Sequence, residues 1–206
     1  MKMTKGSRIA VISLVTTTVL GIVLLAGYII RSRNQLPVLG EPGHRAGAFA
    51  FVNQAGQTIT EQDVAGKVTV VEYFFTTCPG ICKLMNRNLE RVYKTFHDQP
   101  DFMILSHTVD PEADSAPVLQ AYASGFGAES GNWQFLTGNK DSLYRMARQE
   151  YLLSVEDAGK TGTVDDFIHT QYVCLVDRER RLRGFYDATD SLSVAALILD
   201  VGRLLK

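Results

Sequence analysis

The sequence predicts an α/β protein with a mixed central sheet, preceded by one N-terminal transmembrane helix. Strand-like and helix-like segments alternate from residue 68 onward, which is typical of a sheet covered by helices. Near the carboxyl end, two strand-like segments follow each other with only a turn between them, so part of the sheet is antiparallel. Before all of these segments, a stretch without any charged residue begins at Ile9 and ends at Ile30.

The uncharged stretch predicts a membrane anchor. As a helix it spans roughly 33 Å, close to the roughly 30 Å hydrocarbon core of a bilayer. A cleaved signal peptide has a shorter apolar region that ends at a small-x-small site, so we expect a retained anchor. Basic residues slightly favour a cytoplasmic N-terminus, residues 1–8. We therefore expect a single-pass protein of the bacterial inner (cytoplasmic) membrane, with its globular domain on the periplasmic side.

Residues 31–44 are predicted to be a linker, and residues 45–206 a single globular domain. The domain opens with a hairpin, because two short strand-like segments flank the turn Asn-Gln-Ala-Gly. A nearly continuous apolar run then predicts a strand that is buried on both faces. The predicted elements are strands 48–52, 57–60 and 68–75, helix 82–97, strand 102–109, helix 117–126, strand 133–136, helix 141–150, strands 167–176 and 181–186, and a Ser-capped helix 191–205.

Charge is distributed unevenly along the chain. The first 33 residues hold five of the 21 basic residues and no acidic residue. The rest therefore has 16 basic against all 22 acidic residues, a net charge of −6. A negative domain argues against nucleic acid as a partner. It favours a metal cation or a partner protein with a complementary basic surface.

Two cysteines lie where the buried strand gives way to a helix, in the segment Thr-Thr-Cys-Pro-Gly-Ile-Cys at 76–82. At a helix N-terminus, the N–H groups and the dipole lower the pKa of a thiol and favour the thiolate. A thiolate is both a metal ligand and a nucleophile in thiol exchange. Cys78 and Cys82 therefore suit either chemistry and can close a disulfide in an oxidising compartment, with two buried core cysteines as the alternative.

The four histidines are the candidates for a third metal ligand. His44 lies in the linker, and His97 lies at a helix end, where a surface or helix-dipole role is common. His107 lies in the middle of an apolar strand, which is typical of a hydrogen-bonded core histidine. His169 lies at the entrance of a strand after an acidic loop, a position that is more often structural when taken alone.

Several motifs together resemble the Sco/SenC family. They are VTVVEYFFTTCPGIC, ILSHTVDPEAD, AYASGFG followed by WQFLTG, and His169 with LVD at 175–177. The resemblance covers roughly residues 45–205. It implies a thioredoxin-like fold and a membrane-anchored copper protein, and the copper ligands of the family correspond to Cys78, Cys82 and His169.

The resemblance implies a metallochaperone rather than an enzyme. Such a protein takes one copper ion per chain, Cu(I) or Cu(II), from an upstream copper donor. It delivers the copper to the binuclear copper site of cytochrome c oxidase subunit II or a related apo-cuproenzyme. The alternative is a thiol–disulfide oxidoreductase that keeps the cysteines of that partner reduced. The chain has no proline after Pro117, and His169 stands where such an oxidoreductase carries a cis-proline, which favours the chaperone.

The sequence departs from the family pattern near the predicted ligands. Lys83 replaces a proline after the second cysteine, and its charge favours the thiolates. Ile168 replaces an aspartate before the ligand histidine, which removes a hydrogen-bond partner of the imidazole. Asp110 and Asp114 resemble the acidic loop of the family, so we expect them to support the ligands or to contact the partner. Cys174 replaces an aromatic residue, and we expect it in the core, with a redox role as the alternative.

Overall fold

The structure is a computed structural model that describes residues 5–33, 35–128, 131–153 and 170–206. The chain divides into two compact units, Met1–Pro37 and Val38–Lys206. The first unit contains helix α1 (Lys5–Arg33), which includes the predicted anchor. Within the residues described, no helix combines the length and the apolar character that crossing a bilayer requires. The predicted transmembrane helix is therefore not confirmed.

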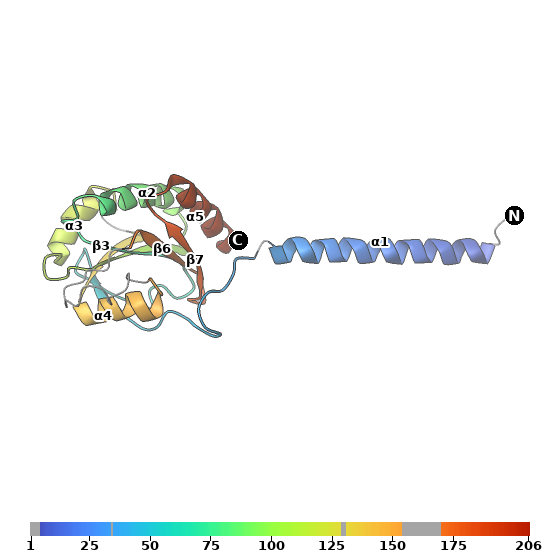
Figure 1. Cartoon of the computed structure of the whole chain (residues 1–206), viewed down its shortest axis with the longest axis horizontal. Helices are drawn as coiled ribbons and strands as arrows, with labels where there is room; N and C mark the ends of the chain where they lie inside the picture. Colours follow the sequence, from blue (N-terminus) through green and yellow to red (C-terminus); the bar gives the residue numbers. More distant parts are fainter. Residues whose placement is uncertain (1–4, 34, 129–130, 154–169) are drawn as a thin grey trace, which may run out of the picture. The chain divides into compact units, whose positions relative to one another are not determined.

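The second unit is built around a seven-stranded mixed sheet with the order β2-β1-β5-β4-β3-β6-β7 (Figure 1). The three central strands β3, β4 and β5 are parallel. On one side the sheet continues with the antiparallel strands β6 and β7, and on the other with the antiparallel hairpin β1–β2. The strands are β1 (Ala50–Asn53), β2 (Thr58–Thr60), β3 (Val68–Phe74), β4 (Phe102–Thr108), β5 (Trp133–Thr137), β6 (Tyr172–Val176) and β7 (Leu182–Asp187).

Helices cover both faces of the sheet. Figure 1 shows α2, α3 and α5 on one face, and α4 with its continuation on the other. β3 and β4 are buried along their whole length between these layers, as the apolar run in β3 predicted. The predicted α/β class with a mixed central sheet is thus confirmed. The helices are α2 (Ile81–Phe96), α3 (Ala116–Ser124), α4 (Lys140–Arg145), the π-helix η1 (Met146–Glu150) and α5 (Ser191–Leu204).

One hydrophobic cluster joins the sheet to α4 and to the segment before β1. Its members include Phe51, Leu105 and Leu143, all almost inaccessible to solvent. Cys174 belongs to this cluster and is fully buried, so its expected place in the core is confirmed. The chain from Val38 onward is part of the same compact unit, because the Leu39 N–H donates to the carbonyl of Leu182 at 2.9 Å.

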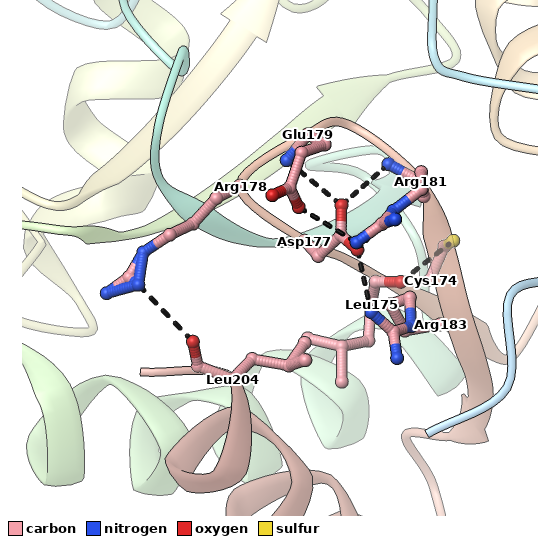
Figure 2. Close-up of polar contacts among 8 residues, drawn as sticks. All are labelled: Cys174, Leu175, Asp177, Arg178, Glu179, Arg181, Arg183 and Leu204. Carbon is pink, nitrogen blue, oxygen red and sulfur yellow. Dashed lines mark hydrogen bonds and ion pairs between the residues drawn. The ribbon is translucent and has the colours of Figure 1, made fainter. Parts of the chain in front are cut away.

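The turn between β6 and β7 is held by the buried carboxylate of Asp177 (Figure 2). Asp177 accepts hydrogen bonds from the N–H groups of Glu179 and Arg181, at 3.0 and 2.9 Å. It also pairs with the guanidinium groups of Arg181 and Arg183, at 2.8 and 2.7 Å. These contacts hold the pKa of Asp177 below its usual value although burial opposes them. The turn therefore fixes β7 against β6.

Three local predictions differ from the structure. The N-cap of α5 is Asp190 instead of a serine, since its carboxylate accepts from the N–H groups of Leu192 and Ser193. A charged carboxylate is favoured at the positive end of the helix dipole. The helix predicted over 141–150 changes to π-helical geometry at Met146. β6 begins at Tyr172, later than predicted, and part of the predicted strand, 167–169, lies outside the described residues.

Candidate metal and thiol site

The two site cysteines lie in the loop that joins β3 to α2. Phe74 of β3 is the register partner of Thr108 of β4 in the parallel pair, so the loops that follow these strands meet at one edge of the sheet. The Cys78 N–H donates to the carbonyl of Phe75 at 3.2 Å, which turns the chain away from the strand. Helix α2 then begins after Gly80, which has no side chain to cap it.

Asp114 fixes this loop from the neighbouring one. Its carboxylate is fully buried and accepts the N–H of Thr76 at 3.2 Å and the hydroxyl groups of Thr76 and Thr108. Thr76 is two residues before Cys78, so the structure brings Asp114 to the cysteine loop. Because the carboxylate is inaccessible, it can position the loop but cannot contact a partner protein.

Asp110 and Lys83 are placed differently. The Asp110 carbonyl accepts the N–H of Asp114 at 2.9 Å, and its N–H donates to Thr108 at 3.0 Å, so these bonds stabilise the turn after β4. Lys83 follows Cys82 on α2 and is exposed. It forms no salt bridge with any residue in the described ranges, and its charge faces solvent beside the cysteine loop.

The two site thiols differ in acidity although both are buried. The Cys82 N–H donates to Cys78 Sγ at 3.4 Å, so this sulfur caps the first turn of α2. Burial raises the pKa of Cys78, but the Cys82 thiol and the N–H groups of residues 80–82 outweigh it and hold the pKa below its usual value. Burial, together with the neighbouring Cys78 sulfur, raises the pKa of Cys82. Cys78 is therefore the more acidic thiol of the pair and Cys82 the less acidic one.

A buried carboxyl group near this pair was not predicted from the sequence. Glu72 lies in β3 and is fully buried, with Oε1 accepting from the hydroxyl of Ser106. Its Oε2 has no hydrogen-bond partner among the described residues. Burial raises the pKa of Glu72 to about 8, and its charge adds to the rise in the pKa of Cys82. The signal that could have revealed it is a single acid in an otherwise apolar strand.

Asn86 is the second polar residue that sequence reasoning missed. It lies one turn after Cys82 on α2, is fully buried, and donates from Nδ2 to the carbonyl of Cys82 at 2.9 Å. The same amide is 3.4 Å from the hydroxyl of Tyr122, whose ring stacks on Phe74 with 5.3 Å between centroids. These contacts tie the first turns of α2 to α3 and to the end of β3.

Three of the four histidines lie within the described residues. The His44 ring nitrogen Nε2 is 2.8 Å from the carbonyl of Glu150, which attaches the segment before β1 to η1. His97 is exposed at the end of α2, where its Nε2 lies 3.2 Å from the carboxylate of Asp98. His169 lies outside the described residues, so its predicted role as a ligand stays a prediction.

His107 is a core residue, as predicted, but its ring lacks the expected hydrogen bonds within the described residues. Both ring nitrogens are without a partner in the part of the chain that is described. The reason is an aromatic enclosure: its ring stacks on Tyr73 with 4.9 Å between centroids and meets Phe49, Phe51 and Tyr151 at 5.5 to 6.3 Å. Burial lowers the pKa of His107 to about 3, so the ring is neutral. Because aromatic side chains enclose the ring and it is fully buried, it is not a candidate ligand.

The described residues do not contain a complete metal site. Among them, no group of three or more His, Cys, Asp or Glu side chains is arranged to hold a metal ion. The predicted set of Cys78, Cys82 and His169 extends beyond these residues. The two sulfur atoms are free thiols in this structure and are soft donors, and the lowered pKa of Cys78 favours the thiolate that a copper ligand requires.

The fold and the thiol pair together define a thioredoxin-like α/β protein with two cysteines where its first sheet-covering helix begins. The profile of the family described as SCO1/SenC matches residues 39–205. The chain therefore belongs to the SCO1/SenC family, as the sequence motifs predicted.

Individual relatives agree with this assignment. The SCO1 protein homolog of Bacillus subtilis is 28% identical over 155 residues, which cover 74% of this chain and 79% of the relative. A SCO1/SenC family lipoprotein from Bacillus anthracis superimposes with a TM-score of 0.69 and 25% identity, over 82% of this chain and all of the other. Copper-bound ScoI from Bradyrhizobium japonicum has a TM-score of 0.60 and 20% identity, over 78% of this chain and 99% of the other.

A further solved relative, BsSco, is described as a member of the Sco family of cytochrome c oxidase assembly proteins with a disulfide switch. It superimposes with a TM-score of 0.66 and 23% identity, over 82% of this chain and 98% of its own. These superpositions confirm the thioredoxin-like fold.

Proposed function

We propose that the protein is a copper chaperone. It binds one copper ion, as Cu(I) or Cu(II), through Cys78, Cys82 and His169. It receives copper from an upstream donor and delivers it to the binuclear copper site of cytochrome c oxidase subunit II or a related apo-cuproenzyme. The observation that carries the proposal is the thiol pair at the start of α2, where the Cys78 sulfur already accepts the Cys82 N–H. The copper-bound relatives and the oxidase-assembly family support the choice of metal and partner.

The sheet register supports His169 as the third ligand. β6 is antiparallel to β3, with Cys174 opposite Val71. The amino end of β6 therefore lies at the same sheet edge as the carboxyl end of β3, where the cysteine loop begins. His169 precedes Tyr172, the first residue of β6, by three positions. An imidazole at this edge would complete a set of two thiolates and one nitrogen, which suits copper.

Metal binding must release a proton from Cys82, because a thiol binds copper as the thiolate. Cys78 has a lowered pKa and is the first sulfur to engage the metal. A three-ligand site leaves a position open for a ligand of the partner, which a carrier needs in order to hand over its metal.

The unequal pKa values of the two thiols favour a second function at the same site, reduction of a disulfide in the partner. The Cys78 thiolate attacks one sulfur of the partner disulfide, forms a mixed disulfide and releases the other sulfur as a thiolate. Cys82 loses its proton and attacks Cys78 Sγ, which releases the second partner thiolate. Two electrons pass to the partner, and Cys78 and Cys82 end as a disulfide.

We also propose that α1 holds the chain in the bacterial inner membrane, with the body on the periplasmic side. Eight aliphatic side chains between Leu14 and Leu25 expose more than half of their surface, and lipid would cover them. The hydroxyl groups of residues 16–18 donate to carbonyls one turn earlier, which satisfies them without water. Labelling of Cys78 in intact cells by a membrane-impermeant maleimide checks this, and labelling only after lysis would contradict it.

The test of the copper proposal is a titration of the whole chain with copper(I), without oxygen, against a competing chelator. We expect one copper per chain and at least a tenfold weaker affinity for His169→Ala, because one of three ligands is lost. His97→Ala and Cys174→Ala are matched controls, since His97 is exposed away from the loop and Cys174 lies in the core. Equal retention by His169→Ala and wild type would overturn the ligand set.

A further inference from the structure

The exposed face of α2 carries a row of basic residues that begins beside the cysteines. Lys83, Arg87 and Arg91 follow each other at intervals of four, so they lie along one side of the helix. All three side chains are exposed, and Lys94 continues the row by one turn. We call Lys83, Arg87 and Arg91 the basic row.

The basic row is unusual because it is not neutralised. Like charges at this spacing destabilise a helix by about 0.2–0.5 kcal/mol per pair. The acid that interrupts the row, Glu90, pairs with Lys94 at 2.6 Å. In the described part of the chain, none of the three basic-row residues forms a salt bridge. The row also lies in a domain with 16 basic against 22 acidic residues, so its charge is opposite to that of its surroundings.

Two exposed apolar residues accompany the row at the cysteine end of α2. Ile81 and Leu84 expose 40% and 48% of their surface. Ile81 lies between the two cysteines in sequence, and Leu84 is next to Lys83. An apolar centre with a charged rim is the usual composition of a protein docking surface.

We propose that the first turns of α2, with the basic row, Ile81 and Leu84, dock an acidic surface of the partner protein. This inference rests on the proposed function, because any partner that exchanges copper or electrons must bring its ligands to Cys78. A partner at Cys78 lies directly against the start of α2. The negative net charge of the domain predicts a partner with a basic surface. The basic row instead predicts that the partner surface at the site is acidic.

The probes are synthetic peptides with a Cys-x-x-x-Cys disulfide, flanked by glutamates, lysines or serines. Rate constants for their reduction by the whole chain are measured at low and at physiological ionic strength. We expect the acidic peptide to react at least about tenfold faster than the basic one at low ionic strength, since steering of this kind accelerates association by 10–10³. Salt should reduce the ratio, because the charges are exposed.

The variant Lys83→Glu/Arg87→Glu/Arg91→Glu should invert the order of the two peptides. The matched control is Lys67→Glu/Arg148→Glu/Lys206→Glu, which changes the net charge equally at positions outside α2. The control should keep the wild-type order. Dividing each rate by that of the serine-flanked peptide removes any effect of Lys83 on the reactivity of Cys78. Equal loss of preference in both variants, or no preference in the wild type, would overturn the proposal.

Binding of the same peptides with serines in place of cysteines is measured by fluorescence anisotropy. This measurement separates docking from chemistry. If the acidic peptide binds to the row but no peptide is reduced, the docking surface is supported and the reductase function fails. The peptide measurements are repeated with the whole chain in bilayers of phosphatidylglycerol or of phosphatidylcholine. If the preference for the acidic peptide disappears in phosphatidylglycerol and persists in phosphatidylcholine, the basic row faces the lipid, and the proposal is overturned.

Discussion

His107 provides the most quantitative prediction, because its ring is enclosed by aromatic side chains and its nitrogens have no partner within the described residues. Its pKa falls from 6.5 in the unfolded chain to about 3 in the folded protein, owing to burial. Between these two values the unfolded state binds a proton that the folded state does not. Stability that is complete above pH 6.5 is therefore lost as the pH falls towards 3.

The size of this loss follows from the two pKa values. Each pH unit between them costs about 1.4 kcal/mol, so wild type should lose about 3 kcal/mol between pH 6.5 and pH 4 through this residue alone. His107→Leu removes the titrating group. At neutral pH it also removes two unsatisfied nitrogens, worth about 1–3 kcal/mol each, against about 0.5–1.5 kcal/mol for the lost stacking on Tyr73. We expect the variant to be as stable as wild type, or more stable, at pH 7.

The assay is urea unfolding at several pH values, followed by the fluorescence of Trp133, the single tryptophan of the chain. The difference in unfolding free energy between His107→Leu and wild type should grow by about 3 kcal/mol in favour of the variant from pH 7 to pH 4. His97→Leu, which changes an exposed histidine, should show no such growth. If the unfolding free energies of wild type and His107→Leu change with pH in the same way, the argument that burial lowers the pKa of His107 is refuted.

Three further predictions concern the cysteine site. Glu72→Gln should gain stability relative to wild type as the pH rises from 4.5 to 8, by about 3 kcal/mol at pH 7. In this range the unfolded chain releases the carboxyl proton, whereas the raised pKa of about 8 keeps it on Glu72 in the folded protein. Urea unfolding at several pH values measures the gain, and a stability difference that does not change with pH would contradict it. At neutral pH, iodoacetamide should modify Cys78 before Cys82, which peptide mass spectrometry detects; the opposite order would contradict the pKa assignment. Asp114→Asn should destabilise the fold by about 1–3 kcal/mol and change the alkylation rate of Cys78, whereas unchanged values in both assays would show that the loop does not depend on this carboxylate.

The sequence was sufficient to predict the features that depend on local pattern. The apolar run that ends at Phe74 predicted a buried strand, and the spacing of apolar residues predicted α2 directly after it. The thiol pair was therefore placed correctly at a strand-to-helix junction. The change to π-helical geometry at Met146 was not predictable, since the local pattern there is that of an ordinary helix.

The support of the site depends on contacts between residues far apart in the chain, which no local pattern reveals. Asp114 binds Thr76 across 38 positions, and Glu72 binds Ser106 across 34. Net charge is limited for a similar reason: it averages over the domain and does not describe the exposed face of α2, which is locally basic. The spacing of Lys83, Arg87 and Arg91 was visible in the sequence, but the structure shows that all three are exposed.

The central claim is that one copper ion is held by Cys78, Cys82 and His169. The measurement that tests it most directly is X-ray absorption spectroscopy of the copper-loaded whole chain. We expect two sulfur ligands and one imidazole nitrogen in wild type and in His97→Ala, and loss of the imidazole signal in His169→Ala. A wild-type spectrum without two sulfur ligands, or an imidazole signal that survives His169→Ala, would contradict the account.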